Sequence, residues 1–262
     1  MIVFAAFTPH SPLLMDSIGK ENLKYLEDSR TALGKLAASL EASRPDVIFI
    51  VSSHTLLHEE AFSLNLHDQY VAELKDFGDH STHKTFMPDL ELTTTIQRLA
   101  RTSQIPFVLE SYESLDYGSS VPLLLLTQRI QPKLIPIAYA GMDRKAHMAF
   151  GRLLKEVALM SDKRIAVIAS GDLAHSLTSE APVGFRKEGK QFDETLVRCV
   201  EQFSASALLS LDEEIIEQSA QCALKPMLVL LGLLERMHVR SELLSYEAPF
   251  GVGYLVAQFH VL

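Results

Sequence analysis

Three histidines and an aspartate of this chain stand just after apolar runs. Asp172 and His175 follow one such run, and His10 and His54 each follow another. Runs of small and β-branched apolar residues that end at a turn are typical of buried parallel strands. Ligand-binding groups of an open α/β sheet lie outside the carboxyl ends of its strands. We therefore expect these four side chains to share one polar site.

These residue types favour metal binding with acid–base assistance. Two histidines, an anionic ligand and open coordination positions suit Fe(II), with zinc or copper as alternatives. Prolines on both sides of His10 suit a preorganised ligand, and the two serines before His54 could support a second. His175 is the expected general acid or base. Asp172 would cap a following helix or orient His175, and the two roles are compatible.

Simpler interpretations compete with this one. Each histidine alone could be a surface or helix-start residue, and only the three equivalent placements favour a site. His54 and His58 have the i, i+4 spacing of a zinc-protease helix, but Thr55 stands where that class requires glutamate, which excludes it. Cys222 opens an apolar helix, where it is either a buried small hydrophobe or, at the helix amino terminus, a metal ligand.

Strands and helices alternate along the whole sequence. The expected strands are 2–8, 47–52, 61–66, 107–112, 133–140, 164–170, 241–247 and 253–260. The expected helices are 22–43, 89–101, one opening near 118, 144–160, 187–203, 204–219 and 222–237. Residues 67–87 have no strong period and are expected to form a lid or binding loop. The order predicts one α/β domain over 1–262, with a largely parallel sheet that the closing pair of strands makes mixed, and helices on both faces.

The composition excludes several classes of protein. With 24 basic against 33 acidic residues, a net charge of −9 and no Lys/Arg cluster, a nucleic-acid surface is not expected. Only Cys199 and Cys222 are present, which predicts a reducing cytoplasm and no disulfide framework. The first apolar run lacks a preceding basic region, and 226–234 is too short to span a bilayer, so we expect a soluble protein. Apolar stretches in 204–237 could serve a homodimer contact.

Five motifs occur in one order along the chain. They lie at 7–12 (Phe-Thr-Pro-His-Ser-Pro), 51–54 (Val-Ser-Ser-His), 115–123 (Leu-Asp-Tyr-Gly-Ser-Ser-Val-Pro-Leu), 170–175 (Ser-Gly-Asp-Leu-Ala-His) and 245–254 (Ser-Tyr-Glu-Ala-Pro-Phe-Gly-Val-Gly-Tyr). Together they resemble the class III extradiol ring-cleavage dioxygenase superfamily, the LigB-like proteins, over nearly the whole chain. The likeness is greatest to the Memo-like branch, which includes protein B of the AmmeMemoRadiSam system.

The resemblance implies a LigB-like fold and a two-histidine, one-carboxylate iron site that binds a catechol-like diol and O₂. By position, His10 and His54 match the histidine ligands and His175 matches the catalytic histidine. Ring-cleaving members place a glutamate where this chain has Gln221 and Cys222. Memo-like proteins place a cysteine there, and Cys222 matches it.

Two further positions bear on the activity. Tyr117, expected to be catalytic together with His175 and Asp172, stands where ring-cleaving members usually carry histidine in an Asp-His-Gly motif. Glu247 is a carboxylate in a family-like motif but not at the expected ligand position. The activity that the resemblance implies is oxidative ring cleavage of a small aromatic diol. The alternative is a Memo-like metal-binding protein without that activity, acting in a redox or radical-modification pathway.

Overall fold

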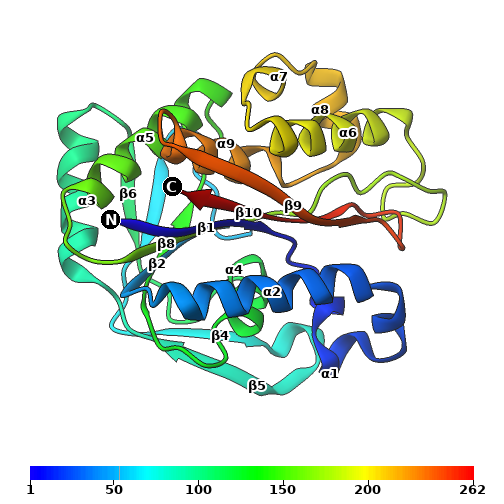
Figure 1. Cartoon of the computed structure of the whole chain (residues 1–262), viewed down its shortest axis with the longest axis horizontal. Coiled ribbons are helices and arrows are strands. Elements are labelled where there is room, and N and C mark those ends of the chain that lie inside the picture. Colours follow the sequence, from blue (N-terminus) through cyan, green and yellow to red (C-terminus); the bar gives the residue numbers. More distant parts are fainter. Residues whose placement is uncertain (53) are drawn as a thin grey trace.

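The computed structural model describes residues 1–52 and 54–262, and its centre is an eight-stranded sheet of order β6-β3-β7-β2-β8-β1-β10-β9 (Figure 1). The four middle strands are mutually parallel: β7 (Lys133–Ala138), β2 (Val47–Ser52), β8 (Ile165–Ser170) and β1 (Ile2–Thr8). Every residue of β2 and β8 is buried, which explains why their sequences are unbroken apolar runs.

Antiparallel pairings flank the four parallel strands on both sides. On one side β3 (Phe62–Asn65) runs antiparallel to β7 and parallel to β6 (Phe107–Glu110). On the other, β10 (Tyr254–Val261) is antiparallel to both β1 and β9 (Val239–Glu247). The predicted single α/β fold with a mixed, mostly parallel sheet is thus confirmed.

Helices cover both faces of the sheet (Figure 1). One face carries α3 (Leu90–Thr102), α5 (Arg144–Leu159), α6 (Lys187–Gln202), α7 (Ser206–Leu209), α8 (Glu213–Ser219) and α9 (Leu224–Leu234). The other carries α2 (Glu27–Ser43), α4 (Tyr117–Leu126) and the short segments η1 (Pro12–Leu14), α1 (Asp16–Gly19) and η2 (Lys20–Tyr25). Asp89, Asp116 and Asp143 cap α3, α4 and α5 by accepting backbone N–H groups, as aspartate commonly does.

The prediction that 67–87 forms a loop without regular structure is wrong. This segment forms a hairpin of β4 (Tyr70–Leu74) and β5 (Asp79–Phe86), joined through η3 (Lys75–Phe77) and a turn at Gly78, whose φ is 83°. Tyr70, Ala72 and Leu74 are buried and alternate with less buried residues. The alternation covers only five residues, too few for a clear period in a polar segment.

The predicted helices also need correction at their ends. The expected helix 22–43 begins at Glu27 and follows a 3₁₀ turn, and the expected helix 204–219 is two short helices. The break between α7 and α8 occurs where Asp212 starts a new helix by accepting the N–H of Glu214. In the part of the chain that the structure describes, no helix is long and apolar enough to cross a membrane.

Candidate metal centre

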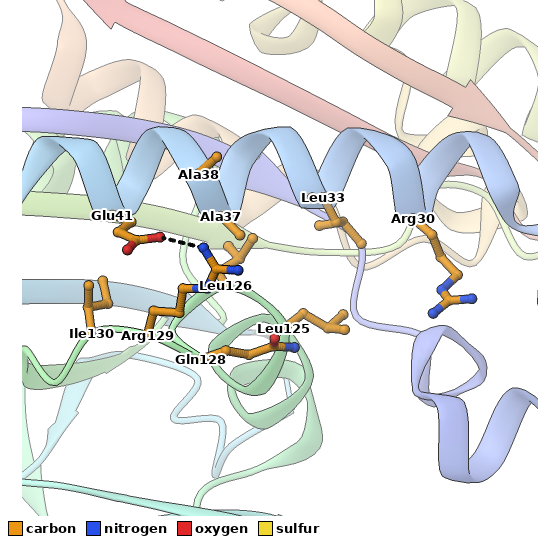
Figure 2. Close-up of a pocket in the computed structure, with 11 residues that line it drawn as sticks. Arg30, Leu33, Ala37, Ala38, Glu41, Leu125, Leu126, Gln128, Arg129 and Ile130 are labelled. Carbon is orange, nitrogen blue, oxygen red and sulfur yellow. Dashed lines mark ion pairs between the residues drawn. The ribbon is translucent and has the colours of Figure 1, made fainter.

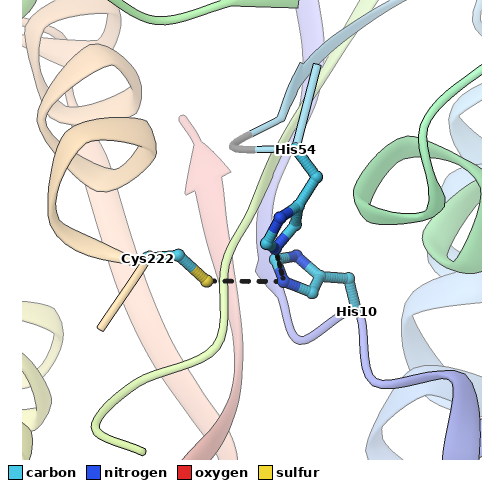
Figure 3. Close-up of side chains that lie close together, drawn as sticks. All are labelled: His10, His54 and Cys222. Carbon is cyan, nitrogen blue, oxygen red and sulfur yellow. Dashed lines mark hydrogen bonds between the residues drawn. The ribbon is translucent and has the colours of Figure 1, made fainter. Parts of the chain in front are cut away.

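Three predicted metal ligands lie together beyond the carboxyl ends of the parallel strands (Figure 3). Nε2 of His10 is 3.0 Å from Nε2 of His54 and 3.4 Å from Sγ of Cys222. All three donor atoms lie within 4.8 Å of one another. Metal bonds of about 2.0–2.3 Å place the donors of one ion roughly 3–4 Å apart, so the cluster fits a single ion.

Hydrogen bonds orient the ring of His10. Its Nδ1 lies 2.9 Å from Oγ of Ser170, and that hydroxyl donates its hydrogen to the carbonyl of Gly118 at 2.5 Å. Because the hydroxyl hydrogen is used, the oxygen must accept from Nδ1–H, which leaves Nε2 unprotonated. This is the tautomer that a metal ion requires.

Both histidine ligands are neutral near physiological pH. Burial, together with the charge of His175, lowers the pKa of His10 to about 3. Burial and then the charge of His10 lower the pKa of His54 to about 4, against an opposing effect of Asp116. No proton therefore competes with a metal ion for these rings at neutral pH.

His54 is the exposed member of the cluster. Its ring stacks on Tyr117 with the centroids 4.2 Å apart, and the Tyr117 hydroxyl lies 2.8 Å from Nε2. Its backbone N–H donates to Oγ of Ser52 at 3.3 Å, whereas Ser53, the other serine expected to support it, lies outside the described residues. Gly118 is needed here, because a Cβ would lie 2.5 Å from Oγ of Ser52 and 3.1 Å from Cδ2 of His54.

Tyr117 is a protonated phenol. Burial, followed by the negative charges of Cys222 and Asp172, raises its pKa. Its hydroxyl lies 2.8 Å from Nε2 of His54. Tyr117 therefore contacts the very atom that a metal ion would bind.

Backbone contacts hold Cys222 against the loop that follows β8. The N–H of Asp172 donates to Sγ at 3.2 Å, and the N–H of Cys222 donates to the carbonyl of Asp172 at 3.1 Å. Gly171 permits this approach, since a Cβ there would lie 2.6 Å from Cα of Ala223. Cys222 lies two residues before α9 and does not open that helix as predicted. The loop contact, not the helix, places the sulfur.

Asp172 supports His10. Its Oδ1 accepts from the backbone N–H of His10 at 2.9 Å, and its Oδ2 lies 3.9 Å from Nε2 of that ring. The next helix begins only at Lys187, so the predicted helix-capping role is wrong. Burial raises the pKa of Asp172 to about 6, although the His10 N–H and the charge of His175 act in the opposite direction.

His175 lies near enough to influence the charge of both ring ligands. Its backbone N–H donates to the carbonyl of Ser219 at 2.9 Å. Its Nδ1 is buried and has no hydrogen-bond partner among the described residues, so Asp172 does not fix its tautomer through that atom. An unpaired buried ring nitrogen costs about 1–3 kcal/mol and needs an explanation, which a ligand-binding role provides.

The other polar candidates lie elsewhere. The side-chain oxygen of Gln221 accepts the N–H of Leu224 at 2.8 Å, at the start of α9. Glu247 accepts a backbone N–H at 2.8 Å at the start of α2. Nε2 of His58, expected at a solvated edge, lies 2.5 Å from Oε1 of Glu110. None of these side chains joins the cluster.

A surface hollow between α2 and the far end of α4 is separate from this centre (Figure 2). It is lined by Arg30, Leu33, Gly34, Ala37, Ala38, Glu41, Leu125, Leu126, Gln128, Arg129 and Ile130. Tyr117 begins α4 and Leu126 ends it, so the hollow lies at the opposite end of that helix from the cluster. The described residues that line it include no histidine, cysteine or aspartate, and a metal centre there is not supported.

Comparisons with known proteins give the family. The model of LigB, the catalytic LigB subunit of aromatic ring-opening dioxygenase, matches residues 4–257. Protein CA_C1420 of Clostridium acetobutylicum is 28% identical over 256 residues, which cover 94% of this chain and 55% of that protein, so the chain spans about half of its length. The crystal structure of the uncharacterized protein JW3007 from Escherichia coli K12 is similar in fold, with a TM-score of 0.71 and 19% identity over 98% of this chain and 99% of that one. Because the family model matches nearly the whole chain, the protein belongs to the LigB family of class III extradiol dioxygenase-like proteins.

Proposed function

We propose that this protein is a metal-dependent oxidoreductase in which His10, His54 and Cys222 hold one first-row transition-metal ion. The observation that carries the proposal is the proximity of their donor atoms, all within 4.8 Å of one another. A sulfur ligand in place of a carboxylate favours softer ions, so zinc and copper compete with Fe(II) for this site. This ligand set is the one that the Memo-like alternative implies.

The surrounding residues prepare the site for an incoming ligand. Ser170 directs the lone pair of His10 Nε2 toward the cluster, and Asp172 holds the backbone of His10. His175 would hold or move a proton of a bound substrate, and its buried Nδ1, which has no hydrogen-bond partner among the described residues, supports this role. When bound, the ion would supply Lewis-acid and redox chemistry to a ligand at an open coordination position.

A second candidate is extradiol cleavage of a catechol-type diol with O₂. The family description favours it, and so does Oδ2 of Asp172, which lies 3.9 Å from His10 Nε2 and offers the carboxylate that Gln221 cannot supply. In that reaction His175 would accept the proton of the diol and return it to the ring-opened product.

Metal titration of the metal-free protein tests the first proposal. Fe(II), Zn(II) and Cu(I) would be added anaerobically to the wild type, to Cys222→Ser and to the matched control Cys199→Ser, which removes a thiol on the buried face of α6. We expect Cys222→Ser to lose about a hundredfold or more in affinity for at least one of these ions, since a lost ligand costs at least as much as a lost supporting contact. Equal affinities in both variants would contradict the ligand set.

A panel of catechols under O₂ separates the two candidates. A yellow ring-opened product from the Fe(II)-loaded protein would establish cleavage, and His175→Ala should then abolish turnover while keeping the metal. The matched control is His58→Ala, outside the cluster. Metal binding with no product from any diol would leave the first candidate alone.

A further inference from the structure

The motif at 245–254 supplies none of the three candidate ligands, yet it lies against the loop that carries His175. The N–H of Leu173 donates to the carbonyl of Gly253 at 2.8 Å. The N–H of Gly253 in turn donates to the carbonyl of Ala174 at 3.0 Å. Two motifs that are far apart in the sequence therefore form one unit after β8.

A buried carboxylate joins this motif to the loop. Asp193 of α6 is 1% exposed; its Oδ1 accepts the N–H of Ala174 at 2.9 Å, and its Oδ2 accepts the hydroxyl of Tyr246 at 2.7 Å. The helix that carries Asp193 lies beside β9, the strand of Tyr246 (Figure 1). A Cβ on Gly253 would lie 2.2 Å from Oδ2 of Asp193, so glycine is needed for this approach.

The bond to Asp193 differs from the other bonds that hold the loop. The N–H groups of Leu173, His175 and Leu177 donate to backbone carbonyls. That of Ala174, which directly precedes His175, donates to the side chain of Asp193. Of these four bonds, it alone depends on a side chain, so a substitution can remove it.

Asp193 is an unfavourable residue for the interior of the fold. Its hydrogen-bond partners among the described residues are neutral, the Ala174 N–H and the Tyr246 hydroxyl. Moving a carboxyl group out of water costs free energy that two neutral partners only partly offset. An apolar side chain of similar size would pack here at a lower cost. The presence of Asp193 is explained if it has a role at the neighbouring His175.

We propose that Asp193 and Tyr246 are positioning residues for His175, on which they act through the backbone of Ala174. The inference rests on the proposed function, in which His175 holds or moves a proton of a bound substrate. It adds two residues outside the metal centre that set the geometry of that histidine.

Nuclear magnetic resonance of the Zn(II)-loaded full chain tests this inference without any turnover. The histidines would be labelled with ¹⁵N, and the ring signals of His175 would be assigned by their loss in His175→Ala. These signals report the tautomer and the surroundings of the ring. The variants are Asp193→Ala, Asp193→Asn and Tyr246→Phe, and Zn(II) affinity and unfolding in urea would be measured for each.

Two control variants separate positioning from stability. Tyr112→Phe removes a phenol that is as exposed as Tyr246 and also donates to a carboxylate, that of Glu110 at 3.1 Å. Val200→Ala leaves a cavity beside another buried residue of α6, seven positions after Asp193. Neither change removes a hydrogen bond of the loop.

We expect the ring signals of His175 to shift in Asp193→Ala and in Tyr246→Phe. The shift should be larger in Asp193→Ala, which loses the bond to Ala174 itself. Asp193→Asn keeps an acceptor for that N–H and should restore the wild-type signals. Zn(II) affinity should be unchanged in all three variants, because no ligand is altered, and both controls should show the wild-type signals of His175.

Wild-type His175 signals in Asp193→Ala would overturn this inference alone. An equally large shift in Val200→Ala would also overturn it, since loss of stability would then account for the effect. If Asp193→Ala does not fold, identical His175 signals in Tyr246→Phe and Tyr112→Phe would have the same consequence. A wild type that takes up no Zn(II) would overturn the proposed function and this inference with it.

Discussion

Buried aspartates lie at both ends of the parallel strands, and their partners differ. At the amino end, Asp89 is 2.8 Å from Nζ of Lys163 and 3.7 Å from Nζ of Lys133. At the carboxyl end, neither Asp172 nor Asp193 has a lysine or arginine within 4 Å among the described residues; the nearest basic group to Asp172 is the ring of His10.

The pKa values of these buried carboxyl groups are shifted in opposite directions at the two ends. Although burial alone would raise it, the pKa of Asp89 is lowered by the hydrogen bond from Lys163. Burial raises the pKa of Asp193 to about 7, against the bonds from Ala174 N–H and the Tyr246 hydroxyl. The amino end therefore uses its carboxylate for stability. The carboxyl end has carboxyl groups without a lysine or arginine partner, and one of them, Asp172, contacts a residue of the candidate metal centre, as is common at functional sites.

The largest effect on stability is expected from replacing Asp89. Replacing it with alanine removes the cap of α3, where Oδ1 accepts the N–H of Leu92 at 3.0 Å, and leaves Lys163 without its buried partner. We expect the free energy of unfolding in urea to fall by about 3–5 kcal/mol, with unchanged metal affinity. The control is Glu91→Ala, the exposed partner of the same lysine, which should cost less than about 1 kcal/mol. Similar losses in both variants would refute this view of the amino end.

Asp193 should make the stability of the metal-free protein depend on pH. Its folded pKa of about 7 lies above the ordinary 3.8. Between these values the folded state holds a proton that the unfolded state has lost, so the free energy of unfolding falls as pH rises through this window. The shift corresponds to roughly 4 kcal/mol at most.

The Asp193→Asn variant cannot titrate at this position, yet keeps an acceptor for the Ala174 N–H. We expect its stability to match the wild type near pH 4 and to exceed it at pH 8, when both are unfolded in urea across this range. If the free energies of unfolding of the two proteins differ by a constant amount at every pH, folding does not raise the pKa of Asp193.

Replacing Ser170 tests whether its hydrogen bond to His10 contributes to metal affinity. Ser170→Ala removes the acceptor that holds Nδ1 of His10. We expect metal affinity to fall about 10- to 100-fold in a competition titration, as when other supporting contacts of ligands are removed. The control is Ser176→Ala, another buried serine of the loop after β8. A larger loss in the control would mean that loop packing, and not ring orientation, sets the affinity.

The sequence predicted the parts of this site that depend on single strands. The unbroken apolar runs of β2 and β8 locate strand ends, and a strand end places His54 or Asp172 within a residue or two of the site. The residues alone left Cys222 open as either a buried hydrophobe or a metal ligand, and the family resemblance favoured the ligand. Its position depends on a contact with Asp172, fifty residues earlier in the chain.

Other features depend on tertiary contacts that have no local signal. The hydrogen bond from His10 to Ser170 joins the ends of two strands, and the hydrogen bond from Ala174 to Asp193 joins a loop to a helix. Ser170 could have been suggested by its place at the end of β8. Asp193 could not, because nothing in the sequence of its helix indicates which loop it contacts.

The smallest expected effect on metal affinity is that of replacing Tyr117. Its hydroxyl lies 2.8 Å from Nε2 of His54, so it contacts the atom that a metal ion would bind. Tyr117→Phe removes this competitor at a cost of about one hydrogen bond to the metal-free state, and Zn(II) should bind up to about fivefold more tightly. The control is Tyr139→Phe. Tyr139 is a half-buried phenol near Cys222 that has no hydrogen bond to His10 or His54 among the described residues. Weaker Zn(II) binding in Tyr117→Phe would mean that the phenol supports the bound ion, and Tyr117 would then count among the groups that hold the metal.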